Sequence, residues 1–148
     1  MGTRSFIALQ TNSGFSGVYC HWDGYLSHNG RILRDHYYET EKIKQLIGLG
    51  YMSTLGPTIS TKHNPKHRTD DQTTYFHRDR EHDWEECQPQ RFETIHDLRK
   101  FAEDCGCEYL YLFDGHAWEY AERGAQFFGL SDGSHFSAFE PLPDNLDD

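Results

Sequence analysis

The sequence lacks long hydrophobic runs. No segment contains the roughly 18 consecutive apolar residues that a membrane-spanning helix needs, which argues against a membrane span. Residues 1–5 lead into a short apolar run without the layout of a secretory signal peptide. Phe6 stands where a myristoylation signal needs Ser or Thr. The expected location is therefore the cytoplasm.

Motifs for metals, cofactors and phosphates are also missing. The chain has only four cysteines, and one residue separates Cys105 from Cys107, which is too tight for the usual zinc spacing. His63 and His67 have the spacing of helical ligands, but Pro65 between them argues against a helix. Calcium loops, phosphate loops and dinucleotide fingerprints do not occur. We therefore expect reduced thiols, no metal site and no cofactor.

Positive charge is scarce, and it is unevenly distributed. The formal net charge is −10, from 14 Lys and Arg against 24 Asp and Glu. Residues 1–68 hold 8 basic and 4 acidic side chains, whereas residues 69–148 hold 6 and 20, a balance of −14. A solvated surface that maintains solubility explains this excess. The alternative is an acidic face that competes for a basic, nucleic-acid-binding partner.

The length of 148 residues is typical of one domain, and aromatic residues, at 15%, can supply much of its core. No repeat or linker interrupts the chain. We expect a single domain over residues 1–140, followed by an acidic C-terminal tail over 141–148 that is frayed.

The pattern of apolar residues and turns predicts an α+β fold. Residues 6–9 and 17–22 are typical of a hairpin, and Asp-Gly at 114–115 indicates a second hairpin between 107–113 and 117–121. Helices are expected over 30–38, from an N-cap at Thr40, and from an N-cap at Thr94 to Gly106. Residues 73–77 indicate another strand, and residues 127–128 and 135–139 could add further strands. The polar stretch 56–72 is expected to form a long surface loop.

The resulting order is β-β-α-α-β-α-β-β. It favours a mostly antiparallel sheet with about three helices packed on one face. The apolar faces of these elements predict a set of largely buried residues. They are Trp22, Ile43, Ile47, Leu98, Phe101, Leu110 and Leu112.

The densest charge cluster follows the strand predicted at 73–77, and it supplies the candidate acidic surface. Its members are Asp79, Glu81, Asp83, Glu85 and Glu86. Arginine forks at Arg78 and Arg80 could hold a phosphate or a carboxylate, although pairing among these surface charges is the commoner explanation of such a cluster.

A polar strand face provides an alternative site. Residues that alternate along a strand share a face, so Tyr19, His21 and Asp23 are expected together, while Cys20 points away from His21. His21 and Asp23 could form a general-base pair, or simply fix the turn that follows. With His77 and Arg78 they would make a nucleotide-binding or hydrolytic site. A third alternative is nucleic-acid binding through the basic 62–68 loop, which contains Lys62, Lys66 and Arg68.

Several segments of the chain resemble a family of small uncharacterised proteins from bacteriophages and prophages. They are residues 1–5, 19–25, 30–33, 43–47, 53–56, 75–80 and 109–113. The string Tyr-Cys-His-Trp-Asp-Gly-Tyr at 19–25 is the most specific of them. The resemblance implies a phage accessory protein in the cytoplasm of the bacterial host, and such proteins often block host defences.

These observations favour a non-enzymatic binding protein over an enzyme. The leading hypothesis is an inhibitor of a host defence system, similar to an anti-CRISPR protein, whose acidic surface contacts a basic, nucleic-acid-binding host protein. No direct contact with nucleic acid or membrane is expected.

Overall fold

The computed structural model describes residues 2–124 and 135–146. The strands are β1 (Ser5–Thr11), β2 (Gly14–Cys20), β3 (Met52–Thr54), β4 (Thr74–Tyr75), β5 (Gln90–Phe92), β6 (Tyr109–Phe113), β7 (Trp118–Glu122) and β8 (Glu140–Pro141). The α-helices of this part are α1 (Arg31–His36), α2 (Thr40–Gly48), α3 (Trp84–Cys87) and α4 (Ile95–Asp104). A π-helical turn over Leu26–Gly30 precedes α1, and a 3-10 turn covers Pro65–His67. No described helix is long and apolar enough to cross a membrane.

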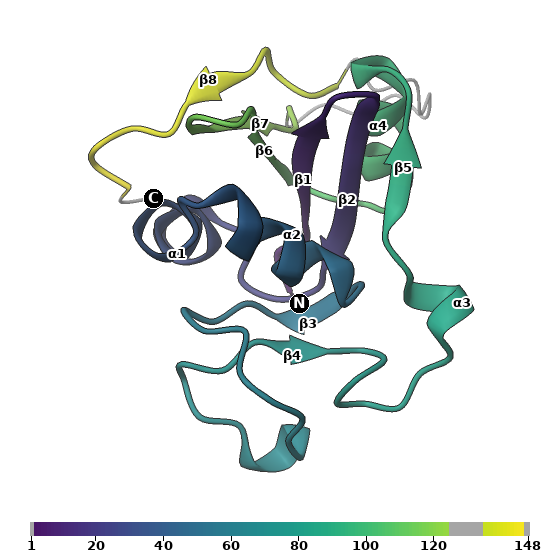
Figure 1. Ribbon diagram of the computed structural model, residues 1–148. Helices are drawn as coiled ribbons and strands as arrows, with labels where there is room; N and C mark the ends of the chain where they lie inside the picture. Colours follow the sequence, from purple (N-terminus) through teal and green to yellow (C-terminus); the bar gives the residue numbers. More distant parts are fainter. Residues whose placement is uncertain (1, 125–134, 147–148) are drawn as a thin grey trace.

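The strands form one mixed sheet in the order β4-β3-β2-β1-β6-β7-β8 (Figure 1). β5 pairs with β2 near its start, at Phe15 to Gly17, whereas β3 pairs with β2 at its last residue, Cys20. Both predicted hairpins are present, β1 with β2 and β6 with β7. The Asp114 carboxylate accepts hydrogen bonds from the backbone N–H groups of His116 and Ala117, which holds the second hairpin turn.

The expectation of a mostly antiparallel sheet holds for five of the seven strand pairings in the described structure, but the sheet is mixed. β1 pairs with β6 in parallel, and β2 pairs with β3 in parallel. The strands β3 and β5 and the short helix α3 were not predicted, since three or four residues carry little periodicity. The general α+β class is confirmed.

The helices cover both faces of the sheet, not one as predicted. α1 and α2 pack on the face that presents Ile7 and Tyr111, and α4 packs on the face that presents Phe6 and Leu110. Figure 1 shows α2 in front of the β1–β2 hairpin and α4 behind it. Because neighbouring residues of β1 and β6 point in opposite directions, each strand contributes to two separate cores. The domain therefore has three layers.

Most predicted core positions are buried. Ile43, Leu98 and Leu110 have no exposed surface, and Ile47 and Leu112 are 3% and 5% exposed. Phe101 is only partly buried, between Phe6 and Phe92. The prediction for Trp22 is wrong, because this side chain is 44% exposed. β2 ends at Cys20, so the alternation of faces no longer applies at Trp22.

The helix boundaries agree with the local signals, with one exception. Thr94 caps α4 and accepts a hydrogen bond from the Asp97 N–H at 3.1 Å, as the capping pattern predicts. Gly106 follows this helix with a φ of +76°, a left-handed conformation that favours glycine. Thr40 is the first residue of α2 rather than its N-cap, which is Glu39.

The segment expected as a frayed tail packs onto the domain as far as it is described. Pro141 belongs to β8, the Leu142 N–H donates to the Trp118 carbonyl oxygen, and Leu146 is 1% exposed. Of the further strands expected, 127–128 lie outside the described residues, and Phe136 makes a single bridge with Arg123.

Candidate binding surface

A buried ion pair organises the chain between β4 and α3. Arg78 donates from Nε and from a terminal nitrogen to the Asp79 carboxylate at 2.9–3.2 Å, and it also donates to the Ser60 carbonyl oxygen. The Asp79 side chain has no exposed surface. Its carboxylate also accepts hydrogen bonds from the backbone N–H groups of His63 at 3.1 Å and Tyr75 at 2.8 Å. The pair thereby ties the long 56–72 loop to β4.

This burial corrects the expected composition of the acidic surface. Asp79 is 5% exposed and its charge is satisfied internally, so it does not belong to that surface. The four other predicted residues are exposed, and we call them the acidic segment. They are Glu81, Asp83, Glu85 and Glu86.

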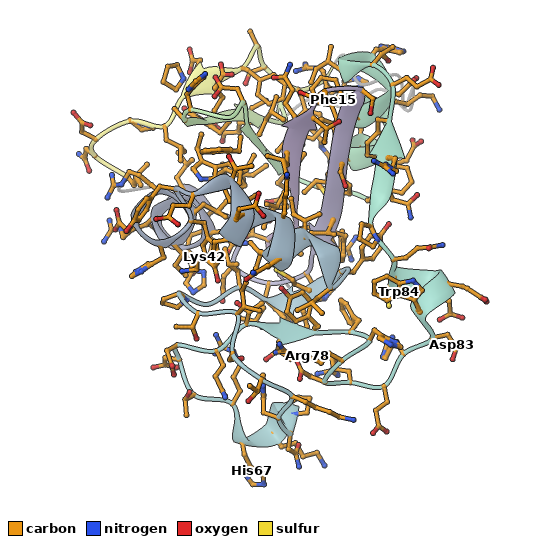
Figure 2. The ribbon with its side chains drawn as sticks, in the orientation of Figure 1. Phe15, Lys42, His67, Arg78, Asp83 and Trp84 are labelled. Carbon is orange, nitrogen blue, oxygen red and sulfur yellow. The ribbon has the colours of Figure 1, made fainter. Side chains whose placement is uncertain are left out.

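The acidic segment runs from the turn after β4 into α3. Figure 2 shows Asp83 at the outer margin of the molecule and Arg78 closer to its centre. Glu81 has a left-handed backbone with a φ of +62°, and its carboxylate lies 3.7 Å from the Lys62 ammonium group. No ion pair involving Asp83, Glu85 or Glu86 is found in the described part of the chain.

The basic 62–68 loop is largely occupied by contacts of its own. Lys62 pairs with Glu81, and His63 hydrogen-bonds through Nε2 to the Thr74 hydroxyl at 2.9 Å. Arg68 donates to the Gln72 carbonyl oxygen. Acidic and basic segments are therefore neighbours, which reduces the positive potential that a nucleic acid would meet.

The alternative polar face is not assembled as a single site. The Tyr19 hydroxyl and His21 Nδ1 are 2.8 Å apart, but Asp23 is oriented toward Tyr25 and His28. Among residues 2–124 and 135–146, no hydrogen bond or ion pair joins His21 to Asp23.

The other members of that alternative have separate roles. His77 Nδ1 lies 2.8 Å from the His82 carbonyl oxygen, and its ring packs against Trp84. Arg78 neutralises Asp79 and covers the Tyr75 ring. Its donors are thus engaged within the protein.

The cysteine thiols are held in the protonated form. Burial raises the pKa of Cys20 to about 11 and that of Cys105 to about 11. Burial also raises the pKa of Cys87 and of Cys107. Because the thiolate is the reactive species, none of the four has the environment of an activated nucleophile. All four are free thiols.

Burial lowers the pKa of His21, and the nearby cations Arg4 and Arg80 lower it further by smaller amounts. A neutral imidazole beside the Tyr19 hydroxyl fits a hydrogen-bonded structural role. No group of three or more histidine, cysteine, aspartate or glutamate side chains in the described ranges is arranged to hold a metal ion.

An apolar hollow beside the acidic segment was not predicted. It is a pocket of about 330 Å³, which we call the aromatic pocket. Its lining residues are Tyr19, Tyr51, Phe76, His82, Glu86, Cys87 and Cys105. They come from β2, from the residue before β3, from the turn after β4, from α3 and from the end of α4. No local sequence pattern joins these segments, although Tyr19 was already named for its position on β2.

A second hollow of about 540 Å³ also adjoins the acidic segment. Its lining includes Lys62, His77, Glu81, Asp83 and Trp84. Glu86 therefore lines the aromatic pocket, whereas Glu81 and Asp83 line this second hollow.

Comparisons of the chain with protein-family models, with curated proteins and with solved structures find no match.

Proposed function

We propose that this protein is a non-enzymatic binding protein whose acidic segment occupies a basic surface on a nucleic-acid-binding partner. In this proposal it is a phage accessory protein, the partner is a defence protein of the bacterial host, and binding blocks access of nucleic acid to that protein, as an anti-CRISPR protein would. The phage origin rests on the resemblance of residues 19–25 and the other segments named above.

The observation that carries the proposal is the exposure of four carboxylates on a braced segment. Glu81, Asp83, Glu85 and Glu86 lie within six residues, and all four are exposed. The Arg78–Asp79 pair anchors the chain just before them. A braced segment loses little backbone entropy on binding, so the ordering cost is largely limited to its side chains.

Charge complementarity supports the choice of partner. The acidic segment belongs to the half of the chain with a balance of −14. The negative electrostatic potential of such a surface repels nucleic acid and attracts the basic channels that bind nucleic acid. The buried, protonated thiols and the divided polar face support binding rather than catalysis.

The test is capture of partners from a bacterial lysate, followed by competition with DNA. The variant carries Glu81→Gln, Asp83→Asn, Glu85→Gln and Glu86→Gln. The proposal expects capture of a nucleic-acid-binding protein that elutes at high salt, is displaced by DNA and is not captured by the variant.

The matched control carries four amide changes at exposed glutamates elsewhere, which remove four negative charges as the test variant does. They are Glu39→Gln, Glu41→Gln, Glu93→Gln and Glu108→Gln. Capture by this control should match the unmodified protein. Equal loss in both variants would show a mere effect of net charge, and tight direct binding of the protein to DNA or RNA would overturn the proposal.

A further inference from the structure

We propose that the aromatic pocket receives an arginine side chain from the basic partner, with its guanidinium between the aromatic rings and the Glu86 carboxylate. This inference rests on the proposed function and specifies the chemistry of recognition beside the acidic segment.

The walls of the pocket are fixed in place by backbone hydrogen bonds. The Tyr51 N–H donates to the Cys87 carbonyl oxygen at 2.7 Å, and the Phe76 N–H donates to the Tyr51 carbonyl oxygen at 3.0 Å. The His82 N–H then donates to the Phe76 carbonyl oxygen at 2.9 Å. Four lining residues from three segments are thus connected in series. The pocket is preformed, so a ligand does not have to order it.

The lining is mainly aromatic. The Tyr19 and Tyr51 ring centroids are 5.8 Å apart at 52°, and those of Phe76 and His82 are 5.1 Å apart at 48°. Burial raises the pKa of Tyr19 and of Tyr51 to about 12, so both phenols are neutral. Neutral aromatic faces attract cations through the negative charge of their π-systems.

Glu86 is the only charged side chain among the lining residues. It is exposed, and within the described structure its carboxylate makes no hydrogen bond or ion pair. The cation Arg4 is not among the lining residues, although it lies close enough to Tyr19 and Cys105 to lower the pKa of both. The lining therefore offers aromatic rings and one available carboxylate, a combination that suits a cation.

Arginine fits this combination better than lysine. Its planar guanidinium stacks on aromatic rings and can donate two parallel hydrogen bonds to one carboxylate. A pocket of about 330 Å³ is at the small end of the range for ligand pockets, which suits one long side chain. Asp83 and Glu85 on the adjoining surface would attract further basic residues of the same partner.

The experiment is an NMR titration of the full chain with the peptide acetyl-Gly-Arg-Gly-amide. The neutral peptide with citrulline in place of arginine has the same shape and serves as the probe of charge. We expect the arginine peptide to shift the resonances of Tyr19, Tyr51 and Phe76, with the citrulline peptide at least tenfold weaker.

Two variants test the assigned contacts. Glu86→Gln should weaken binding of the arginine peptide about tenfold, because it removes a charged hydrogen-bond acceptor. Glu93→Gln, a matched change at an exposed glutamate outside both the pocket lining and the acidic segment, should change it by less than about twofold. Phe76→Leu, which keeps an apolar side chain but loses the π-face, should weaken binding about threefold while the remaining spectrum stays folded.

Equal binding of the arginine and citrulline peptides would overturn the inference, as would equal effects of Glu93→Gln and Glu86→Gln. Titration with AMP or GMP that shifts the same residues, without a response to arginine, would assign the pocket to nucleotides instead. The proposed function has a separate test, since capture of a basic protein through Glu81, Asp83 and Glu85 can persist when the arginine peptide fails to bind.

Discussion

The Asp79 carboxylate should contribute more to stability than any other acidic group between β4 and α3. Asp79→Ala removes the acceptor of the Arg78 donors and of the His63 and Tyr75 backbone N–H groups. Breaking a buried pair by removing one partner typically costs about 3–5 kcal/mol, because the remaining charge is left without compensation. Since the Arg78 side chain is only 15% exposed, water cannot readily replace the lost carboxylate.

Asp79→Asn tests the charge separately from the shape. The amide keeps one oxygen acceptor but presents an NH₂ group to donors, so we expect a cost of about 1.5–3 kcal/mol. Asp83→Ala, on the exposed acidic segment, should change the free energy of unfolding by less than about 0.5 kcal/mol. This contrast separates burial from the mere presence of an aspartate.

Urea unfolding followed by circular dichroism measures these free energies. Amide hydrogen exchange should locate the effect of Asp79→Ala in residues 56–82, with β1 and β6 still protected. A cost below about 1 kcal/mol, with unchanged exchange at His63 and Tyr75, would refute the assignment of this pair as the anchor of the loop.

Three further predictions concern the core, the titratable groups and metals. Leu110→Ala should cost about 2–5 kcal/mol in urea unfolding, since this side chain is fully buried beneath α4, and a cost near zero would contradict that packing. Burial raises the pKa of Cys20 from 9.0 to about 11 and the pKa of Tyr19 and Tyr51 from 10.0 to about 12, so their contribution to stability is complete below about pH 9. The free energy of unfolding should therefore fall as pH rises from about 9 to 12, and a rise over that range would contradict the burial of these groups. Chelation with EDTA should leave the melting temperature unchanged, whereas stoichiometric zinc, iron or manganese in the purified protein would contradict the absence of a metal role.

Local sequence signals were sufficient for the hairpins and for α4. Asp114-Gly115 and the Thr94–Asp97 pattern act over three or four residues, and the structure confirms both. Parallel pairing has no such marker, because β1 and β6 are joined through more than ninety intervening residues. The presence of helices on both faces of the sheet was indicated by one sequence feature. Residues 109–113 are continuously apolar or aromatic, which is typical of a strand buried on both faces.

The candidate site was predictable only in part. The dense cluster of charged residues after β4 indicated the acidic segment. Nothing in the sequence distinguished the buried Asp79 from its exposed neighbours, because only the fold brings its partners His63 and Tyr75 to it. The aromatic pocket could not be predicted either. Its walls come from residues as distant as Tyr19 and Cys105, and backbone contacts across strands that are two or three residues long bring them together.

The most direct test of the account is the association rate of this protein with its captured partner, measured between 0.1 and 1 M salt. Over that range the Debye length falls from about 10 Å to about 3 Å, so steering by the acidic segment should be lost. We expect a fast, salt-sensitive rate for the unmodified protein and for the four-amide control at Glu39, Glu41, Glu93 and Glu108. The variant with amides at Glu81, Asp83, Glu85 and Glu86 should associate slowly at every salt concentration, with an unchanged melting temperature. An association rate that changed neither with salt nor with these four substitutions would contradict the account. It would show that the partner binds a different surface of the protein.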